Sequence, residues 1–222
     1  MNNKELIEKY LKKYEDIFSP LEKQFILNYQ EKDYHDKIIP DLIREVYDEL
    51  GLLQDKDNIF IGFINHLDEE FSIKDKRIIE VGGGIIPRLG KRINTIQTTG
   101  NITIYDPRLS IYEESTNKLK LVRRSFTPWT NIKNSDLLIG LMPCEATEAI
   151  ISNAINNNKD FMIALCDGMH GDIYDYYIET DEWIESIIHY SERLLKERNM
   201  GKIKTKSLSK YNNPYPVIYN ER

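Results

Sequence analysis

The sequence is poor in cysteine and contains no long hydrophobic run. Its two cysteines, Cys144 and Cys166, and its four histidines do not show the clustered spacing of a structural zinc site. The longest apolar stretches, near Leu137–Pro143 and Phe161–Cys166, are far shorter than the ~20 residues of a transmembrane helix. The charged segment Met1–Tyr14 lacks the apolar centre of a signal peptide. We therefore expect a cytoplasmic protein with free thiols, no metal site and no membrane segment.

An excess of positive charge is also absent. The chain has 30 Lys and Arg residues against 36 Asp and Glu residues, which gives a formal net charge of -6. A globally basic surface for nucleic acid is thereby excluded, although a local basic patch stays open, so we favour a small-molecule substrate. The 222 residues are enough for one domain with a full core and a helical extension. Nothing in the sequence indicates the oligomeric state.

The first third of the chain has the spacing of helices. Apolar residues recur at helical intervals in three stripes between residues 4 and 71. Ser19-Pro20-Leu21-Glu22 combines a serine cap, a proline at the first position and a glutamate that can reach back, and Gly51 is a natural helix stop. We predict that residues 1–75 form a helical region that packs on the domain that follows.

From Arg77 onward, short apolar runs alternate with polar or helical stretches. The predicted strands are Arg77–Val81, Ile102–Tyr105, Leu119–Arg123, Asp136–Leu141 and Asp160–Cys166. Several of these runs are apolar without alternation, as expected for strands buried on both faces of a parallel sheet. Most are far enough apart for a crossover helix, whereas the interval from Val122 to Asp136 predicts a loop or a single turn. Residues 76–222 are thus predicted to form an α/β domain with a mostly parallel, doubly wound sheet.

The C-terminal segment predicts an antiparallel hairpin. Asp181–Arg198 has helical spacing, and the segments Lys202–Leu208 and Tyr215–Tyr219 alternate or carry β-forming residues. The residues 212–214, Asn-Asn-Pro, have the composition of a turn between them.

A glycine cluster after the first predicted strand is the strongest sign of a ligand site. Arg77–Val81 runs directly into Gly82, Gly83 and Gly84, and Glu80 lies two residues before the first glycine. Glycine permits positive backbone dihedrals and close approach of a ligand to the main chain. Ligands of open parallel sheets bind at the carboxyl ends of the strands. A ligand loop therefore explains the cluster better than a plain tight turn does.

A second acid follows the second predicted strand. Asp106 ends the run Ile102–Tyr105, where a carboxylate can accept hydrogen bonds from ribose hydroxyls. A simple turn or cap aspartate is the alternative, and Pro107 supports it. The 26 positions from Glu80 to Asp106 slightly exceed the ~20 of dinucleotide folds, and the turn at residues 98–101 can hold the extra residues.

The sequence Glu80-Val81-Gly82-Gly83-Gly84 followed by Asp106 resembles the class I S-adenosylmethionine-dependent methyltransferases, whose first strand ends in an acid-x-Gly-x-Gly loop. The resemblance covers Arg77–Arg222. It implies a Rossmann-like domain whose last strand is inserted between the fifth strand and its hairpin partner. It also implies a methyltransferase of unknown substrate. No Asn/Asp-Pro-Pro-aromatic motif follows the fourth strand, which argues against methylation of the adenine amino group.

The resemblance further implies S-adenosylmethionine as the cofactor. The expected binding residues are Glu80, Gly82, Gly83 and Gly84 in the loop, Asp106 at the ribose, Phe126 and Thr127 near the adenine, and Met142 after the fourth strand. Gly82 and Gly84 would flank the methionine part of the cofactor. A carboxylate such as Glu80 suits the sulfonium and ammonium charges of that part.

Three residues are weaker candidates for catalysis. Cys144 and Cys166 follow the fourth and fifth strands, and their placement resembles, in a few residues only, the cytosine-C5 methyltransferases, in which a thiolate attacks the base. Their apolar neighbours favour small packed residues with a raised thiol pKa, and we adopt that interpretation. His170 lies in a glycine-rich loop and could act as a general base, although most loop histidines have no chemical role.

Two alternative functions stay open. An NAD(P)-binding protein is the first, but Gly82-x-Gly84-x-x-Pro87 has proline where the dinucleotide fingerprint has its third glycine. The second is a non-catalytic protein of the same fold that binds the cofactor or a partner, because no catalytic motif is visible.

Overall fold

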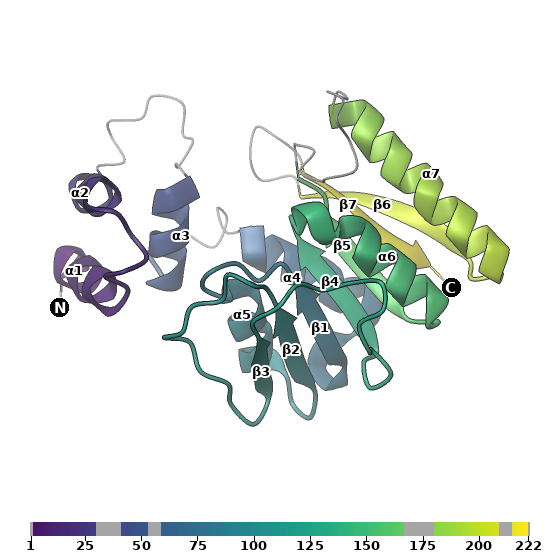
Figure 1. Ribbon diagram of the computed structural model, residues 1–222, viewed down its shortest axis with the longest axis horizontal. Coiled ribbons are helices and arrows are strands. Elements are labelled where there is room, and N and C mark those ends of the chain that lie inside the picture. Colours follow the sequence, from purple (N-terminus) through teal and green to yellow (C-terminus); the bar gives the residue numbers. More distant parts are fainter. Residues whose placement is uncertain (1, 30–40, 53–58, 167–179, 209–214, 222) are drawn as a thin grey trace. The chain divides into compact units, whose positions relative to one another are not determined.

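The computed structural model describes residues 2–29, 41–52, 59–166, 180–208 and 215–221 (Figure 1). The chain divides into two compact units, Met1–Asn58 and Ile59–Arg222. The division precedes the helix Ile59–Phe71, so this helix belongs with the sheet that follows it.

The first unit contains the helices α1 (Asn3–Lys13), α2 (Pro20–Asn28) and α3 (Asp41–Glu49). The predicted start of α2 is present as a capping box: the Ser19 amide donates to Glu22 Oε2 at 2.7 Å, and the Glu22 amide donates to Ser19 Oγ at 3.3 Å. Apolar side chains of α1 are buried, as the first stripe predicts.

The second unit is built around a seven-stranded sheet. Its elements are α4 (Ile59–Phe71), the short helix η3 (Ile73–Asp75), β1 (Arg77–Val81), α5 (Arg88–Ile96), β2 (Asn101–Tyr105), β3 (Leu119–Val122), β4 (Leu137–Leu141), the short helix η4 (Cys144–Ala146), α6 (Thr147–Asn156), β5 (Asp160–Ala164), α7 (Thr180–Arg198), β6 (Lys202–Leu208) and β7 (Tyr215–Glu221). The strand order is β3-β2-β1-β4-β5-β7-β6. Strands β1 to β5 are parallel, and β7 is antiparallel to both β5 and β6. The predicted mostly parallel sheet with an inserted last strand is therefore confirmed.

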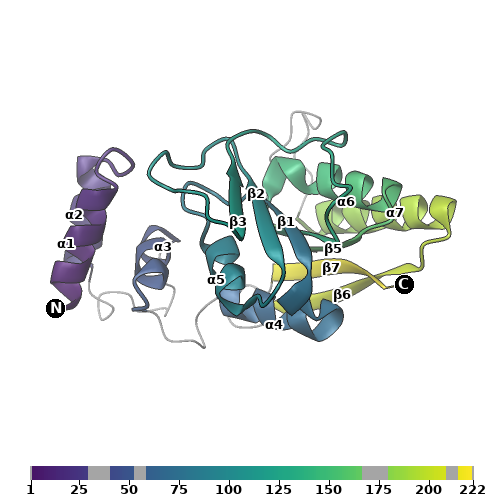
Figure 2. The same ribbon diagram turned by 90° about the horizontal axis from the view of Figure 1, so that it is seen from below.

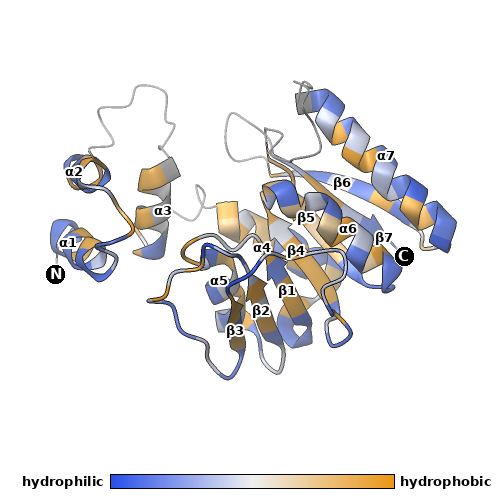
Figure 3. Ribbon diagram, in the orientation of Figure 1, coloured by the Kyte–Doolittle hydropathy of each residue, from blue (hydrophilic) through white to orange (hydrophobic). Residues whose placement is uncertain are grey.

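Helices cover both faces of the sheet, as a doubly wound fold requires (Figures 1 and 2). Buried residues of α4 and α5 pack on one face, and buried residues of α6 and α7 pack on the other. All five residues of β4 are buried, in agreement with a central strand that lacks alternation. In Figure 3 the central strand β4 is largely orange, the edge strand β6 is largely blue, and the helices carry both hydrophobic and hydrophilic positions.

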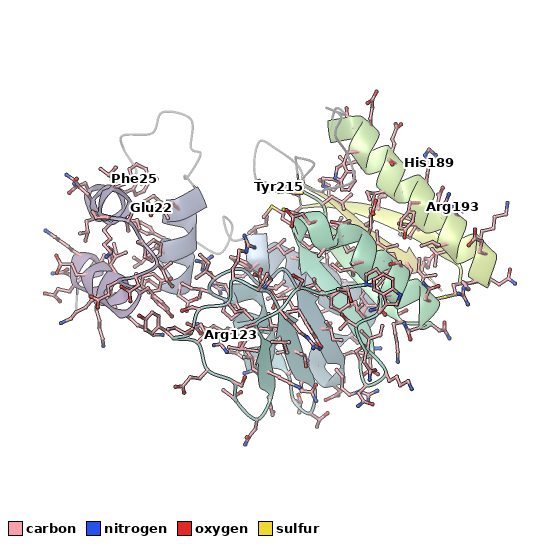
Figure 4. All side chains as sticks on the ribbon, in the orientation of Figure 1. Glu22, Phe25, Arg123, His189, Arg193 and Tyr215 are labelled. Atoms are coloured by element: carbon pink, nitrogen blue, oxygen red, sulfur yellow. The ribbon has the colours of Figure 1, made fainter. Side chains whose placement is uncertain are left out.

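Two connections differ from the simple alternation of strand and helix. Residues 106–118 and 123–136, all of which the structure describes, contain no helix. The short second connection was expected to be a loop, but the first was long enough for a helix. Side-chain hydrogen bonds to the backbone hold this first loop instead: Arg123 Nη2 donates to the carbonyls of Ser110 at 2.8 Å and Glu113 at 2.6 Å (Figure 4). Pro107 also removes one amide donor near the start of the loop.

Candidate functional site

A cavity of about 380 Å³ lies at the carboxyl ends of β1, β2 and β4. This volume is in the range of small-molecule binding sites, and the position is where open parallel sheets bind ligands. The residues that line it are Val81, Gly82, Tyr105, Asp106, Pro107, Arg108, Ser125, Phe126, Met142, Pro143, Cys144, Glu145 and Ala146. Four of the predicted cofactor residues are among them, together with the catalytic candidate Cys144.

The glycine loop combines two left-handed residues with a tightly packed one. Gly82 has φ +79° and Gly84 has φ +74°, values that side-chain-bearing residues rarely adopt. A Cβ atom on Gly82 would lie 3.0 Å from Pro143 Cα, whereas one on Gly84 would meet nothing within 4 Å. A Cβ atom on Gly83 would lie 2.5 Å from Ile104 Cγ2. The first and third glycines thus allow the left-handed turns of the loop, Gly82 also lets Pro143 approach closely, and Gly83 allows the loop to pack on β2.

Asp106 joins the end of β2 to the glycine loop. Its Oδ2 accepts a hydrogen bond from the Gly84 amide at 2.9 Å, and its side chain is 3% exposed. Arg108 donates to the same carboxylate through its amide at 2.7 Å, Nε at 3.2 Å and Nη2 at 3.0 Å. Burial works to raise the pKa of Asp106, but the hydrogen bonds from Arg108 and Gly84 outweigh burial and lower it. The carboxylate is therefore ionised, and Asp106 forms part of the cavity wall.

Glu80 is buried beneath the loop and does not line the cavity. The residue is 2% exposed, and its Oε2 has no hydrogen-bond partner among the described residues. Burial raises the pKa of Glu80 to about 8, only partly offset by the Gly90 backbone, and the nearby Asp106 charge adds to the rise. Glu80 is consequently mostly neutral at pH 7 without a ligand, which the expectation of a charged carboxylate did not foresee.

Gly90 was missed in the sequence. It lies inside α5, where a Cβ atom would collide with the Glu80 carboxyl and the Ile104 side chain. Because Gly90 has no side chain, α5 can approach β1 and β2 closely. The available signal was a glycine within a helical pattern, which commonly has a packing reason.

The aromatic side of the cavity is formed by Phe126 and Tyr105. Their rings contact edge to face with centroids 5.4 Å apart, and the Arg124 guanidinium lies 5.6 Å from the Tyr105 ring centroid. Thr127 is exposed and does not line the cavity. Its carbonyl accepts a hydrogen bond from Asn153 Nδ2 at 3.1 Å, which fastens this loop to α6.

The turn after β4 has an unusual backbone. Met142 has φ +53° and Cys144 has φ +47°, both left-handed without being glycine. Such conformations cost about 1–3 kcal/mol each and concentrate at functional sites. The raised pKa expected for Cys144 is present, but its first cause is a hydrogen bond with the Cys166 thiol, followed by burial. Both cysteines are reduced and half-buried, rather than fully buried.

Arg108 is a second residue that sequence analysis missed, because an arginine two positions after an acid is not a specific signal. His170 lies outside the described residues. Within the described part of the chain, no group of three or more potential metal ligands occurs. None of the described helices is sufficiently long and apolar for a membrane span.

Comparison with known proteins finds similarity in structure but not in sequence. No family model matches the chain, and no curated protein matches it. Magnesium protoporphyrin IX methyltransferase from Synechocystis PCC 6803 with bound SAH gives a TM-score of 0.53 at 10% identity, covering 98% of this chain and 98% of that chain. The same enzyme with bound SAM gives 0.51 at 11% identity, covering 99% and 96%.

At these identities the likeness concerns the fold alone. It agrees with the strand order and with the antiparallel β7 between β5 and β6. This protein has the fold of the class I S-adenosylmethionine-dependent methyltransferases.

Proposed function

We propose that this protein binds S-adenosylmethionine in the cavity beyond β1, β2 and β4 and transfers its methyl group to a small-molecule acceptor. The observation that carries the proposal is the hydrogen bond from the Gly84 amide to the buried Asp106 carboxylate. This bond joins the glycine loop to Asp106, the residue predicted to bind the ribose, at the wall of a cavity of suitable volume. The net charge of -6 supports a small molecule over nucleic acid as acceptor.

The residues present have the chemistry that this cofactor requires. Asp106 would accept hydrogen bonds from the ribose hydroxyls, and Phe126 would contact the adenine, with Thr127 in the adjoining loop. Gly82 and Gly84 would leave room for the methionine part, and Met142 would contact the cofactor from the β4 side. The partnerless Oε2 of Glu80 lies beneath this loop, where a cationic ligand would favour its ionised form. When bound, the cofactor supplies a methyl group activated by its sulfonium charge.

Arg108 has to exchange partners for this binding to occur. Its guanidinium occupies the Asp106 oxygens that the ribose would use. The Arg108 side chain is 69% exposed, so water can replace the carboxylate as its partner at small cost. In the ligand-free site the Asp106 oxygens are therefore occupied by an interaction that is weak enough to be displaced.

The catalytic roles of Cys144, Cys166 and His170 stay predictions. Cys144 is the member of this group that lines the cavity, and the raised pKa of its thiol disfavours a thiolate nucleophile. We accordingly assign no covalent step to it.

We also propose that residues 1–75 act as a helical region that packs on a cofactor-binding domain of residues 76–222 and shapes the acceptor site. A cytoplasmic location belongs to the same proposal. Hydrogen exchange measured with and without S-adenosylmethionine tests the packing, because a cover over the ligand edge should gain protection in its amides. Unchanged exchange throughout residues 2–29 and 41–52 would contradict it.

Calorimetry tests the cofactor against the dinucleotide alternative. The protein should bind S-adenosylmethionine and S-adenosylhomocysteine but not NAD or NADP. The antiparallel β7 already favours this outcome over an all-parallel dinucleotide sheet. Binding of NAD without S-adenosylmethionine would reverse the assignment. Formation of S-adenosylhomocysteine with candidate acceptors then separates an enzyme from a non-catalytic binding protein.

A further inference from the structure

The carboxyl ends of β4 and β5 bring the two cysteines of the chain together. The strands are parallel neighbours with Leu141 opposite Ala164. The Met142 amide donates to the Ala164 carbonyl at 2.8 Å, so the pairing continues one residue past β4. Cys144 lies three residues after Leu141, and Cys166 lies two residues after Ala164. The two side chains therefore leave the same edge of the sheet from adjacent strands.

The backbone that leads into each of the two cysteines is held in place. The Leu165 amide donates to the Pro216 carbonyl of β7 at 2.8 Å, which fixes the residue before Cys166. Neighbouring strands lie ~4.8 Å apart, and a disulfide needs a Cα separation of ~4.4–6.8 Å. The strand ends from which the two cysteines follow are therefore at a separation compatible with a disulfide.

The thiols themselves are in contact. Cys166 is the hydrogen-bond partner of the Cys144 side chain, and Cys144 Sγ also donates to the Met142 carbonyl at 3.4 Å. Both side chains are half-buried, and Cys144 lines the cavity, so a small reagent can reach the pair. The left-handed backbone of Met142 and Cys144 makes the tight turn that follows β4.

We propose that Cys144 and Cys166 form an intramolecular disulfide at the rim of the cavity. It is a modification site in which a covalent bond would tie the turn after β4 to the end of β5. The assignment does not depend on which ligand the cavity binds.

The oxidant is a low-molecular-weight disulfide such as oxidised glutathione. One of the two thiols loses its proton, and its thiolate attacks one sulfur of the reagent and releases one glutathione thiolate. The other thiol then loses its proton and attacks the protein sulfur of the mixed disulfide, releasing the second glutathione thiolate. The two protein thiols give up two electrons, and the two released glutathiones take up the two protons.

Mass spectrometry of the intact folded chain tests the proposal. The chain is equilibrated with mixtures of oxidised and reduced glutathione, acid-quenched and weighed, beside Cys144→Ser and Cys166→Ser. We expect the parent to lose two hydrogens without gaining glutathione, and each variant to gain one glutathione. Because closure is intramolecular, half of the parent chains should be oxidised at a certain ratio of oxidised to reduced glutathione. This ratio should be at least about tenfold lower than the ratio at which half of either variant is modified. Circular dichroism confirms that each chain is folded.

Peptide mapping completes the test by locating the bond. A single peptide pair linked through Cys144 and Cys166, released by a reducing agent, is the expected result. Glutathione on one or both parent thiols, a disulfide-linked dimer, or a parent no easier to oxidise than the variants would each overturn the proposal. Because the readout is mass rather than activity, this failure is distinguishable from failure of the proposed methyl transfer.

Discussion

Acidic residues at the two ends of the sheet have pKa values shifted in opposite directions. At the amino ends, Asp136 accepts hydrogen bonds from the Arg77 amide at 2.9 Å, Nε at 3.0 Å and Nη2 at 2.6 Å. These bonds lower the pKa of Asp136 to about 2. At the carboxyl ends, Glu80 is buried with a partnerless oxygen and a pKa of about 8.

The difference separates a stabilising acid from one that costs stability. Asp136 is paired and partly exposed, so its charge is compensated where it lies. Glu80 is desolvated near a second carboxylate, an arrangement that folding alone does not favour and that is typical of functional sites. The left-handed residues Met142 and Cys144 lie at this same end. Changes at the carboxyl ends should consequently affect ligand binding, whereas changes at the amino ends should affect stability alone.

The largest expected effect on binding is at Gly82. Gly82→Val should abolish S-adenosylmethionine binding, because the new side chain would meet Pro143 and because φ +79° disfavours a β-branched residue. The control is Gly100→Ala at the amino ends of the strands, where a Cβ atom would collide with the Lys76 carbonyl. That variant should lower the unfolding temperature and keep the parent dissociation constant while folded. Calorimetry and thermal unfolding measure both, and parent-like binding by Gly82→Val would place the site elsewhere.

Glu80 should dominate the pH dependence of stability near neutrality. Its raised pKa means that the folded state retains a proton that the unfolded state releases, so stability falls as pH rises from about 5 to about 8. The expected loss is on the order of several kcal/mol. Asp136 has the opposite sign: its contribution is present above its ordinary pKa and is lost as pH falls toward 2.

Urea unfolding across this range is the measurement, with Glu80→Gln as the comparison variant. Glutamine cannot ionise, so the decline between pH 5 and pH 8 should be much flatter in Glu80→Gln. An equal decline in both chains would show that another group is responsible.

Asp106 and Asp136 form a matched pair for separating binding from stability. Asp106→Ala should weaken S-adenosylmethionine binding by about 1–3 kcal/mol, the cost of leaving the ribose hydroxyls without a partner. Asp136→Ala should leave the dissociation constant unchanged and lower the free energy of unfolding by about 1 kcal/mol. If the two substitutions changed binding equally, the contrast between the ends of the sheet would fail.

The smallest expected effect is a gain. Arg108→Ala should tighten S-adenosylmethionine binding by about 1 kcal/mol or less, because the guanidinium no longer competes for Asp106. Arg198→Ala is a suitable control, since Arg198 Nη2 donates to Asn156 Oδ1 in an exposed contact away from the cavity lining. Weaker binding by Arg108→Ala would mean that the arginine contacts the cofactor rather than excluding it.

Much of the fold could be predicted because its signals are local. The unbroken apolar run of β4 indicates burial on both faces, and the Ser19 capping box is complete within four residues. Val217 and Ile218 indicate that β7 is a buried strand, as it is. The glycine loop and Asp106 were visible for the same reason, since each directly follows a run of strand-forming residues. The helix-free loop 106–118 was not predicted, because hydrogen bonds from Arg123, farther along the chain, help to hold it.

Contacts between distant residues were decided by the tertiary structure alone. The neutral state of Glu80 depends on burial beneath α5 and on the space left by Gly90. The meeting of Cys144 with Cys166 depends on β4 and β5 being neighbours with a particular register. Periodicity and turn chemistry describe which elements form, because they arise from residues a few positions apart. Charge states and thiol pairs depend on which strand ends become adjacent and how closely the helices pack, and only the folded chain determines that.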